Sequence, residues 1–113
     1  MILVATELHV RNFLKFWPFI YHASRSSKQV KRSEGCLHSF ISGKGWRIGY
    51  TYTAWKDIET MHQFRNSGAH KIAMKQIRSV SSKYKTAVWE ADSIPAWVEA
   101  LKKLDVIPFK TLD

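Results

Sequence analysis

Hydrophobic and polar residues alternate along residues 2–10 and 46–55. Successive side chains of a strand point to opposite faces, so this alternation predicts two β-strands. Residues 36–43 and 83–91 are interpreted as two further strands. In the strand at 46–55, Tyr50 and Tyr52 share one face and Trp55 lies on the other. The Gly43-Lys44-Gly45 turn predicts that the strands at 36–43 and 46–55 pair antiparallel.

Between these predicted strands, apolar residues recur every three or four positions, as in an α-helix. Phe19, Ala23, Ser26 and Val30 fall on one face of a helix that begins near Pro18 and ends near Ser33. Its small residues allow a close approach to the sheet or leave space for a ligand. A second helix starts at Asp57 and Glu59, whose negative charge suits a helix N-terminus, and stops at Gly68. A third follows over 69–77, and a short fourth begins at 93–95.

The order strand, helix, strand, strand, helix pair, strand, helix predicts a ferredoxin-like α+β sandwich with an antiparallel four-stranded sheet. Residues 1–113 are expected to form one domain, with an extended tail over 105–113. The helices would cover one face of the sheet. The other face carries apolar and aromatic side chains that one short C-terminal helix is not expected to cover. A homodimer with facing sheets is therefore predicted.

Composition narrows the chemistry. The single Cys36 excludes an internal disulfide and a cysteine zinc cluster. The five histidines show no ligand spacing with a carboxylate, so no metal site is expected. No apolar segment approaches the ~20 residues of a membrane helix, and the N-terminus has no basic leader. The predicted location is cytoplasmic, with no membrane partner.

The net charge of +9 favours anionic partners through long-range attraction. The basic residues are scattered, with the densest groups at 25–32 and 71–78. A ferredoxin-like sheet can stack bases on exposed rings, but the strands lack the glycine and aromatic pattern of such RNA-binding sheets. Nucleic acid is therefore not the expected partner.

The run TAWKDIETMHQFRNSGAHKIAM, residues 53–74, resembles monooxygenase-like proteins with the dimeric α/β-barrel fold. The likeness is strongest to the spheroidene monooxygenase-like branch and its uncharacterised small relatives. FWPFIYHASRSSKQV at 16–30, the following Gly35 and Ile94-Pro95-Ala96-Trp97 extend the resemblance over most of the chain. The resemblance implies a dimer with a cavity in each subunit, between sheet and helices.

Proteins of this kind include cofactor-independent monooxygenases that act on aromatic polyketides, haem-degrading enzymes and haem-associated carotenoid oxygenases. The haem-degrading branch has an Asn, a Trp and a His as its signature. Trp55 and His70 match the latter two, but the first strand has no Asn. The resemblance therefore favours no cofactor, with haem as the variant in which His70 is the axial ligand.

His70 is the leading catalytic candidate, as a proton donor, base or haem ligand; otherwise it hydrogen-bonds a carbonyl and fixes the turn. Trp55 either stacks on a flat substrate or fills the core. The substrate-binding candidates are Phe64, His62, Arg65 and His22. Phe64 is otherwise a core residue, and His62 and Arg65 are neighbours on one helix. For these polar residues a solvated position is the competing interpretation.

The function predicted from these residues is that of a small monooxygenase-like oxidoreductase. It would act on a hydrophobic or aromatic organic molecule held in the cavity, with orientation, exclusion of water and one proton-transfer group supplied by the protein. The alternative is a non-catalytic dimeric binding protein for a hydrophobic metabolite or haem.

Overall fold

The structure, a computed structural model, describes residues 1–112 except for the side chain of Ala69. Its sheet contains five antiparallel strands in the order β2-β3-β1-β4-β5. They span Ile2–Val10 (β1), Cys36–Lys44 (β2), Ile48–Trp55 (β3), Ser81–Glu90 (β4) and Lys110–Thr111 (β5). The first four strands have the ferredoxin-like arrangement, so the predicted α+β fold class is confirmed.

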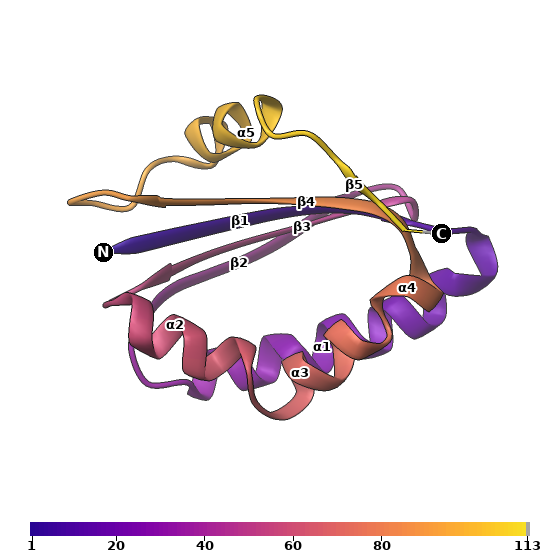
Figure 1. Ribbon diagram of the computed structural model, residues 1–113, viewed down its shortest axis with the longest axis horizontal. Helices are drawn as coiled ribbons and strands as arrows, with labels where there is room; N and C mark the ends of the chain where they lie inside the picture. The colour runs from indigo at the N-terminus through magenta and orange to yellow at the C-terminus, as the bar shows by residue number, and fades with distance from the viewer. Residues whose placement is uncertain (113) are drawn as a thin grey trace.

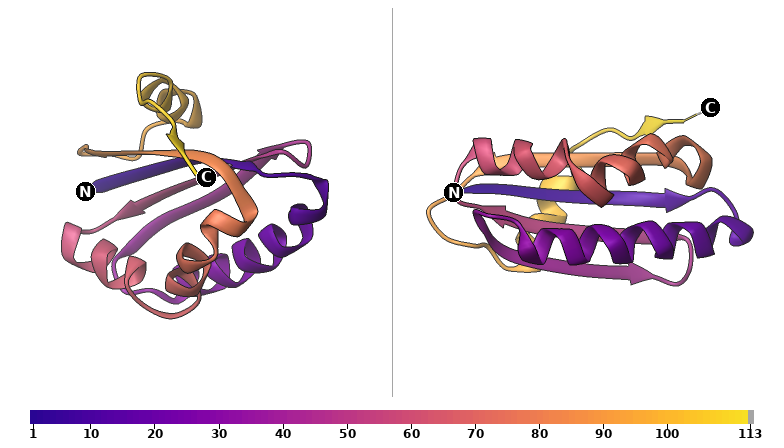
Figure 2. Two further views of the ribbon diagram at one scale, coloured as in Figure 1. Left: turned by 45° about the vertical axis from the view of Figure 1, so that its right-hand side comes forward. Right: turned by 90° about the horizontal axis from the view of Figure 1, so that it is seen from below.

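The helices lie on both faces of this sheet. Figure 1 shows one face above a layer made by α1 (Phe16–Arg32), α2 (Ile58–Arg65), α3 (Gly68–Lys75) and α4 (Ile77–Val80). A short 3-10 helix, η1 (Phe13–Lys15), leads into α1, and α5 (Trp97–Asp105) crosses the opposite face. Viewed from below, α1 runs beside the succession of α2, α3 and α4 (Figure 2).

Local chemistry explains where these helices begin. The Asp57 side chain caps α2 by accepting a hydrogen bond from the Thr60 backbone N–H at 2.9 Å. Pro18 lies in the first turn of α1, where its missing N–H costs no helical hydrogen bond. Gly68, predicted to stop α2, has a φ of +59° and is the first residue of α3. It therefore acts as the joint between the two helices.

Three predictions of boundaries need correction. The single helix expected over 69–77 is broken at Gln76 into α3 and α4. The C-terminal tail begins after α5, which includes Asp105, and contains the short strand β5. Two residues paired with β4 at Lys83 and Tyr84 leave no readable alternation, so the sequence predicted four strands where the sheet has five. Asp113, the end of the predicted tail, lies outside the described residues.

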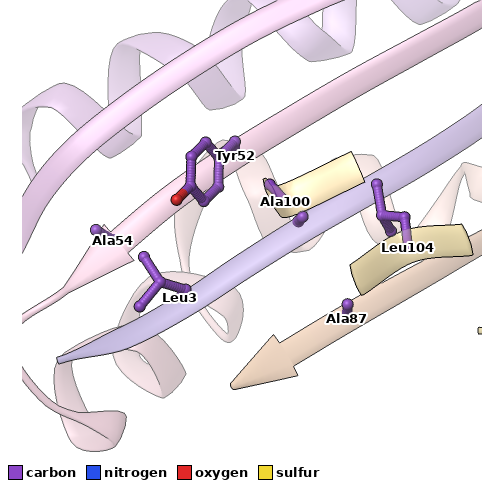
Figure 3. Close-up of a cluster of buried hydrophobic side chains, with 7 residues drawn as sticks. Leu3, Tyr52, Ala54, Ala87, Ala100 and Leu104 are labelled. Atoms are coloured by element: carbon purple, nitrogen blue, oxygen red, sulfur yellow. The ribbon is translucent and has the colours of Figure 1, made fainter. Parts of the chain in front are cut away.

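The face beneath α5 is a packed core. Figure 3 shows Leu3, Tyr52 and Ala54 from the sheet facing Ala100 and Leu104 from α5. All of these side chains are buried, and the Tyr52 hydroxyl donates a hydrogen bond to the Pro95 carbonyl at 2.8 Å. The expectation that one short helix could not cover this face is therefore wrong for its centre. Exposed apolar side chains around this core include Phe40 of β2, Ile94 before α5 and Val98 on α5 itself.

None of the described helices has both the length and the hydropathy that crossing a bilayer requires. The largest helix, α1, has seventeen residues and mixes apolar, hydroxyl and basic side chains.

Candidate active site

A cavity of about 610 Å³ separates the sheet from the helical layer. Its floor is formed by the face of the sheet that carries Val4, Thr6 and Leu8 of β1. Its roof is formed by α1 and α3, with Phe19, Ala23 and Met74 among the lining side chains. The small residues of α1 that the sequence singled out thus face a hollow. The lining is mainly apolar, which suits an organic molecule with few charges.

Three aromatic rings form a column at one end of this cavity. Trp55 at the end of β3 packs against Phe64 of α2, with ring centroids 5.1 Å apart. Phe64 in turn packs against the His70 ring of α3 at 4.5 Å. Trp55 is only 1% exposed, and its Nε1–H donates to Thr53 Oγ1 at 2.9 Å. The structure therefore brings together the two residues that the sequence nominated as catalytic and one nominated for binding.

The His70 ring has a defined tautomer. Its Nδ1 lies 3.3 Å from the Arg65 carbonyl oxygen, and a carbonyl can only accept, so Nδ1 carries the hydrogen. Among the described residues nothing hydrogen-bonds to Nε2, which is left with a lone pair. Burial lowers the pKa of His70 below its ordinary value; the Arg65 guanidinium lowers it further, and the Arg65 carbonyl hydrogen bond opposes both. A neutral imidazole with an available Nε2 can act as a base or a ligand.

Gln29 of α1 holds the segment that carries His70. Its side-chain amide donates to the Phe64 carbonyl at 3.2 Å and to the Ser67 carbonyl at 2.9 Å. Its Oε1 accepts from the His70 backbone N–H at 2.7 Å. A Cβ on Gly68 would come within 2.9 Å of that oxygen, so glycine is required by space as well as by φ. Sequence reasoning missed Gln29, because its partners lie 35 to 41 residues away.

The remaining candidates divide by position. His22 and Arg65 line the cavity. His62 lies on the exposed side of α2 and is not among the lining residues, although Arg65 is only three positions further on. The contribution of each to substrate binding stays a prediction.

Two further features shape the cavity. The ring of Phe19 lies so close to Gly49 that a Cβ there would meet Phe19 Cζ at 2.5 Å. Across the floor, the register places Thr51, Thr6 and Thr86 side by side on three neighbouring strands. The Thr6 and Thr86 hydroxyls are 3.2 Å apart and hydrogen-bonded. The floor therefore offers hydroxyl groups inside an otherwise apolar lining.

Groups that could hold a metal or cofactor are few. In residues 1–112 no three His, Cys, Asp or Glu side chains gather in a way that could hold a metal ion. Cys36 is half-buried, and this burial raises the pKa of its thiol. A hydrogen bond with the backbone of His38 lowers the pKa, but by less. A raised thiol pKa disfavours the thiolate, in keeping with the interpretation of Cys36 as a strand residue.

Whether the cavity suits haem can be judged from the side chains that could bind its iron and its carboxylates. An axial site needs a neutral imidazole nitrogen, which His70 Nε2 offers, and haem's carboxylates need a cation, which Arg65 offers at the same cavity. The apolar lining suits the macrocycle. The chemistry of these residues therefore fits haem: His70 would supply the nitrogen that holds the iron, and Arg65 would pair with a carboxylate.

No family model matches the chain, and no curated protein matches it closely enough to count. Solved structures do match. A candidate antibiotic biosynthesis monooxygenase from Nitrosomonas europaea superposes with a TM-score of 0.74 at 12% identity, over 82% of this chain and 100% of that one. Rv0793 from Mycobacterium tuberculosis has a TM-score of 0.75 at 8% identity, over 84% and 98% of the two chains.

A third structure has a described activity. It is a mutant of SnoaB, a cofactor-independent oxygenase from Streptomyces nogalater, with a TM-score of 0.67 at 10% identity, over 82% of this chain and 94% of that one. At these identities the likeness is one of fold. The closer likeness to the spheroidene monooxygenase-like branch stays a prediction. The chain thus has the ferredoxin-like α+β fold of antibiotic biosynthesis monooxygenase-like proteins, as its sequence indicated.

Proposed function

We propose that this protein is a small monooxygenase-like oxidoreductase that acts on a hydrophobic or aromatic molecule in the cavity between sheet and helices. One observation supports this above the others: an apolar hollow of about 610 Å³ has a neutral, acceptor-ready imidazole, His70, at one end. A cofactor-independent oxygenase with the same fold adds weight to the proposal.

The chemistry needs one base and an electron-rich substrate. His70 Nε2 takes a proton from an activated CH₂ group of the substrate, and the resulting carbanion passes its electrons to O₂. One oxygen atom becomes the carbonyl oxygen of the product and the other leaves as water. The carbon loses four electrons and O₂ gains four, so no external reductant is needed. Exclusion of water by the apolar lining protects the carbanion from reprotonation.

Trp55 contributes through Phe64 rather than through an exposed face. It is buried behind the Phe64 ring, which packs on His70. We therefore assign Phe64 as a part of the cavity wall that holds the His70 ring in place, and Trp55 as its support. We assign His22 and Arg65, which also line the cavity, to polar substituents of the substrate.

A homodimer belongs to this proposal. Exposed apolar side chains on and around α5, which include Phe40, Ile94 and Val98, offer a contact surface on the side of the sheet that α5 covers. Because α5 covers the centre of that face, a partner would meet α5 and the β2 edge rather than the bare sheet. Sedimentation equilibrium measures the mass directly: a dimer is expected, and a monomer at micromolar concentration contradicts it.

Oxygen uptake in the presence of an anthrone such as dithranol tests the oxygenase proposal. The purified protein should accelerate uptake and quinone formation without added metal, flavin or haem. His70→Gln should abolish the acceleration, whereas His62→Gln, the matched change outside the cavity, should preserve it. Equal activity in the wild-type protein and His70→Gln would refute His70 as the base.

The same cavity would serve the alternative, a binding protein for a hydrophobic metabolite or haem. The donor set described above supports this candidate. Added haem should then give a Soret band that shifts in His70→Ala but not in His62→Ala. Tight, stoichiometric haem binding without oxygen-dependent turnover of anthrones would favour the binding protein over the cofactor-free oxygenase.

A further inference from the structure

Most of the helical layer carries basic residues and no acidic ones. Residues 13–32 and 68–80, which span η1, α1, α3 and α4, contain no Asp or Glu. They contain eight basic residues: Lys15, Arg25, Lys28, Lys31, Arg32, Lys71, Lys75 and Arg78. All but Lys15 are exposed, and none of the eight forms an ion pair in the part of the chain that the structure describes. Within the helical layer, η1, α1, α3 and α4 therefore present only positive charge, and the carboxylates of the layer, Asp57 and Glu59, lie at the start of α2.

The same layer exposes large apolar side chains. Leu14, Trp17 and Tyr21 are 78%, 64% and 56% exposed. With Arg25, Lys28 and Arg32 they follow each other at intervals of three or four residues, so they form one outward stripe. We call this the α1 stripe: its first half is apolar and its second half basic.

The two helical runs lie side by side, so the charges combine into one surface. Figure 2 shows α1 running beside α2, α3 and α4 in the view from below. The Lys15 ammonium donates to Ser79 Oγ at 3.5 Å, which places the end of α4 beside the start of α1. The cations of α3 and α4 thus flank the α1 stripe.

We propose that this helical layer docks on a bilayer surface with anionic headgroups. Trp and Tyr side chains favour the headgroup region of membranes, and Leu14 would reach the acyl boundary. The lysines and arginines of η1, α1, α3 and α4 would meet lipid phosphates, and these four elements contain no carboxylate. Exposed Leu14 and Ile72 favour lipid over nucleic acid, because aliphatic side chains offer phosphates and bases little.

Docking through this surface would bring the cavity close to the membrane. The link between docking and substrate supply rests on the proposed function. Ile20 of α1 both lines the cavity and is exposed, one position before Tyr21 of the α1 stripe. An apolar substrate dissolves in the bilayer rather than in water. Docking through α1 would bring the cavity rim to the phase that holds such a molecule. The expectation of no membrane partner rested on the lack of a spanning segment; the proposal replaces it with peripheral binding, which the experiments below test.

Vesicle flotation of the full chain tests the docking. Vesicles of phosphatidylcholine with roughly one third phosphatidylglycerol should carry the protein, and pure phosphatidylcholine should not. The variant Lys28→Gln/Arg32→Gln/Lys71→Gln should lower the partition coefficient about tenfold or more. Lys56→Gln/Lys102→Gln/Lys110→Gln removes the same charge elsewhere and should bind like the wild type. Failure to bind anionic vesicles, or equal loss in both variants, overturns the proposal.

Two further measurements locate the contact. Bromine-labelled acyl chains should quench part of the tryptophan fluorescence, and Trp17→Phe should remove that quenching while the protein still floats. Persistent quenching in Trp17→Phe would overturn the assigned orientation. A single-stranded oligonucleotide that displaces the protein from vesicles at physiological salt would show that nucleic acid is the preferred partner, which also overturns the proposal. None of these readouts uses oxygen turnover, so they are independent of the oxygenase proposal.

Discussion

The two faces of the sheet are built to opposite plans. Toward α5, Leu3, Ala5, Tyr52 and Leu104 are almost completely removed from solvent. Toward α1 and α3, the neighbouring residues of the same strands surround a cavity of about 610 Å³. Successive residues of β1 alternate between the two environments, so a one-residue shift of register would exchange them. One side of the molecule supplies stability and the other supplies space.

The largest expected effect comes from two leucines on β1. Leu3→Ala should lower the free energy of unfolding by about 2–5 kcal/mol, because it removes methyl groups from a packed core. Leu8→Ala should cost less than about 1.5 kcal/mol, because Leu8 is half-buried beside an existing hollow. Urea denaturation of both variants makes the comparison. Equal losses would show that the two faces are packed alike.

Gln29→Ala should have the next largest effect. It leaves the His70 N–H without its partner and the Phe64 and Ser67 carbonyls with only their 3.3 Å bonds from the Ser67 and Lys71 backbone N–H groups, at a cost of about 1–3 kcal/mol. Amide hydrogen exchange should accelerate at His70 more than in β1. Because Gln29 positions His70 rather than touching substrate, the pH profile of any activity should also change shape. An unchanged His70 amide would contradict the assigned role.

Gly49→Ala should affect the cavity more than the fold. The new methyl group would push the Phe19 ring from its place, and the hollow on that side gives the ring somewhere to go. We expect a stability loss below about 1 kcal/mol together with weaker binding of bulky aromatic ligands. Phe19→Ala in the same background should restore binding. Calorimetric titration measures both, and unchanged binding in Gly49→Ala would argue against this part of the cavity as a ligand site.

The smallest effect is the pH dependence contributed by His70. Its pKa is lowered in the folded protein by burial, so the unfolded chain binds more protons below its own pKa of about 6.5. The stabilising contribution of neutral His70 is complete above that pH and is lost as pH falls through the folded-state pKa. The stability advantage of the wild type over His70→Gln should therefore shrink from pH 7.5 toward pH 5. An advantage that grows on acidification would reverse the sign assigned here.

Periodicity predicted the parts of this structure that depend on neighbours in sequence. Alternation placed Trp55 and Tyr52 on opposite faces, and the acidic pair after β3 placed the start of α2. Periodicity did not predict two features, because both depend on residues far apart in the sequence. Gln29 is defined by contacts with the α2–α3 joint, and the cover over Tyr52 depends on how α5 returns to the sheet.

In the candidate site, too, the sequence predicted what depends on nearby residues and not what depends on tertiary packing. A Trp, a Phe and a His near one end of the sheet could be gathered from the 53–74 motif, and the column of Trp55, Phe64 and His70 has that composition. Helical spacing made His62 and Arg65 neighbours, but it could not tell which of them faces the cavity. That choice depends on the rotation of α2, which is set by burial of Met61 and Phe64.

The ring column has an optical consequence. Trp55 is shielded from water and contacts the imidazole only through Phe64, so a guest molecule that shifts Phe64 changes the surroundings of a single deeply placed indole. The fluorescence of Trp17, the most exposed of the tryptophans, would not change when a guest molecule shifts Phe64. The chain thus contains a native fluorescent reporter for its interior and a separate one for its surface.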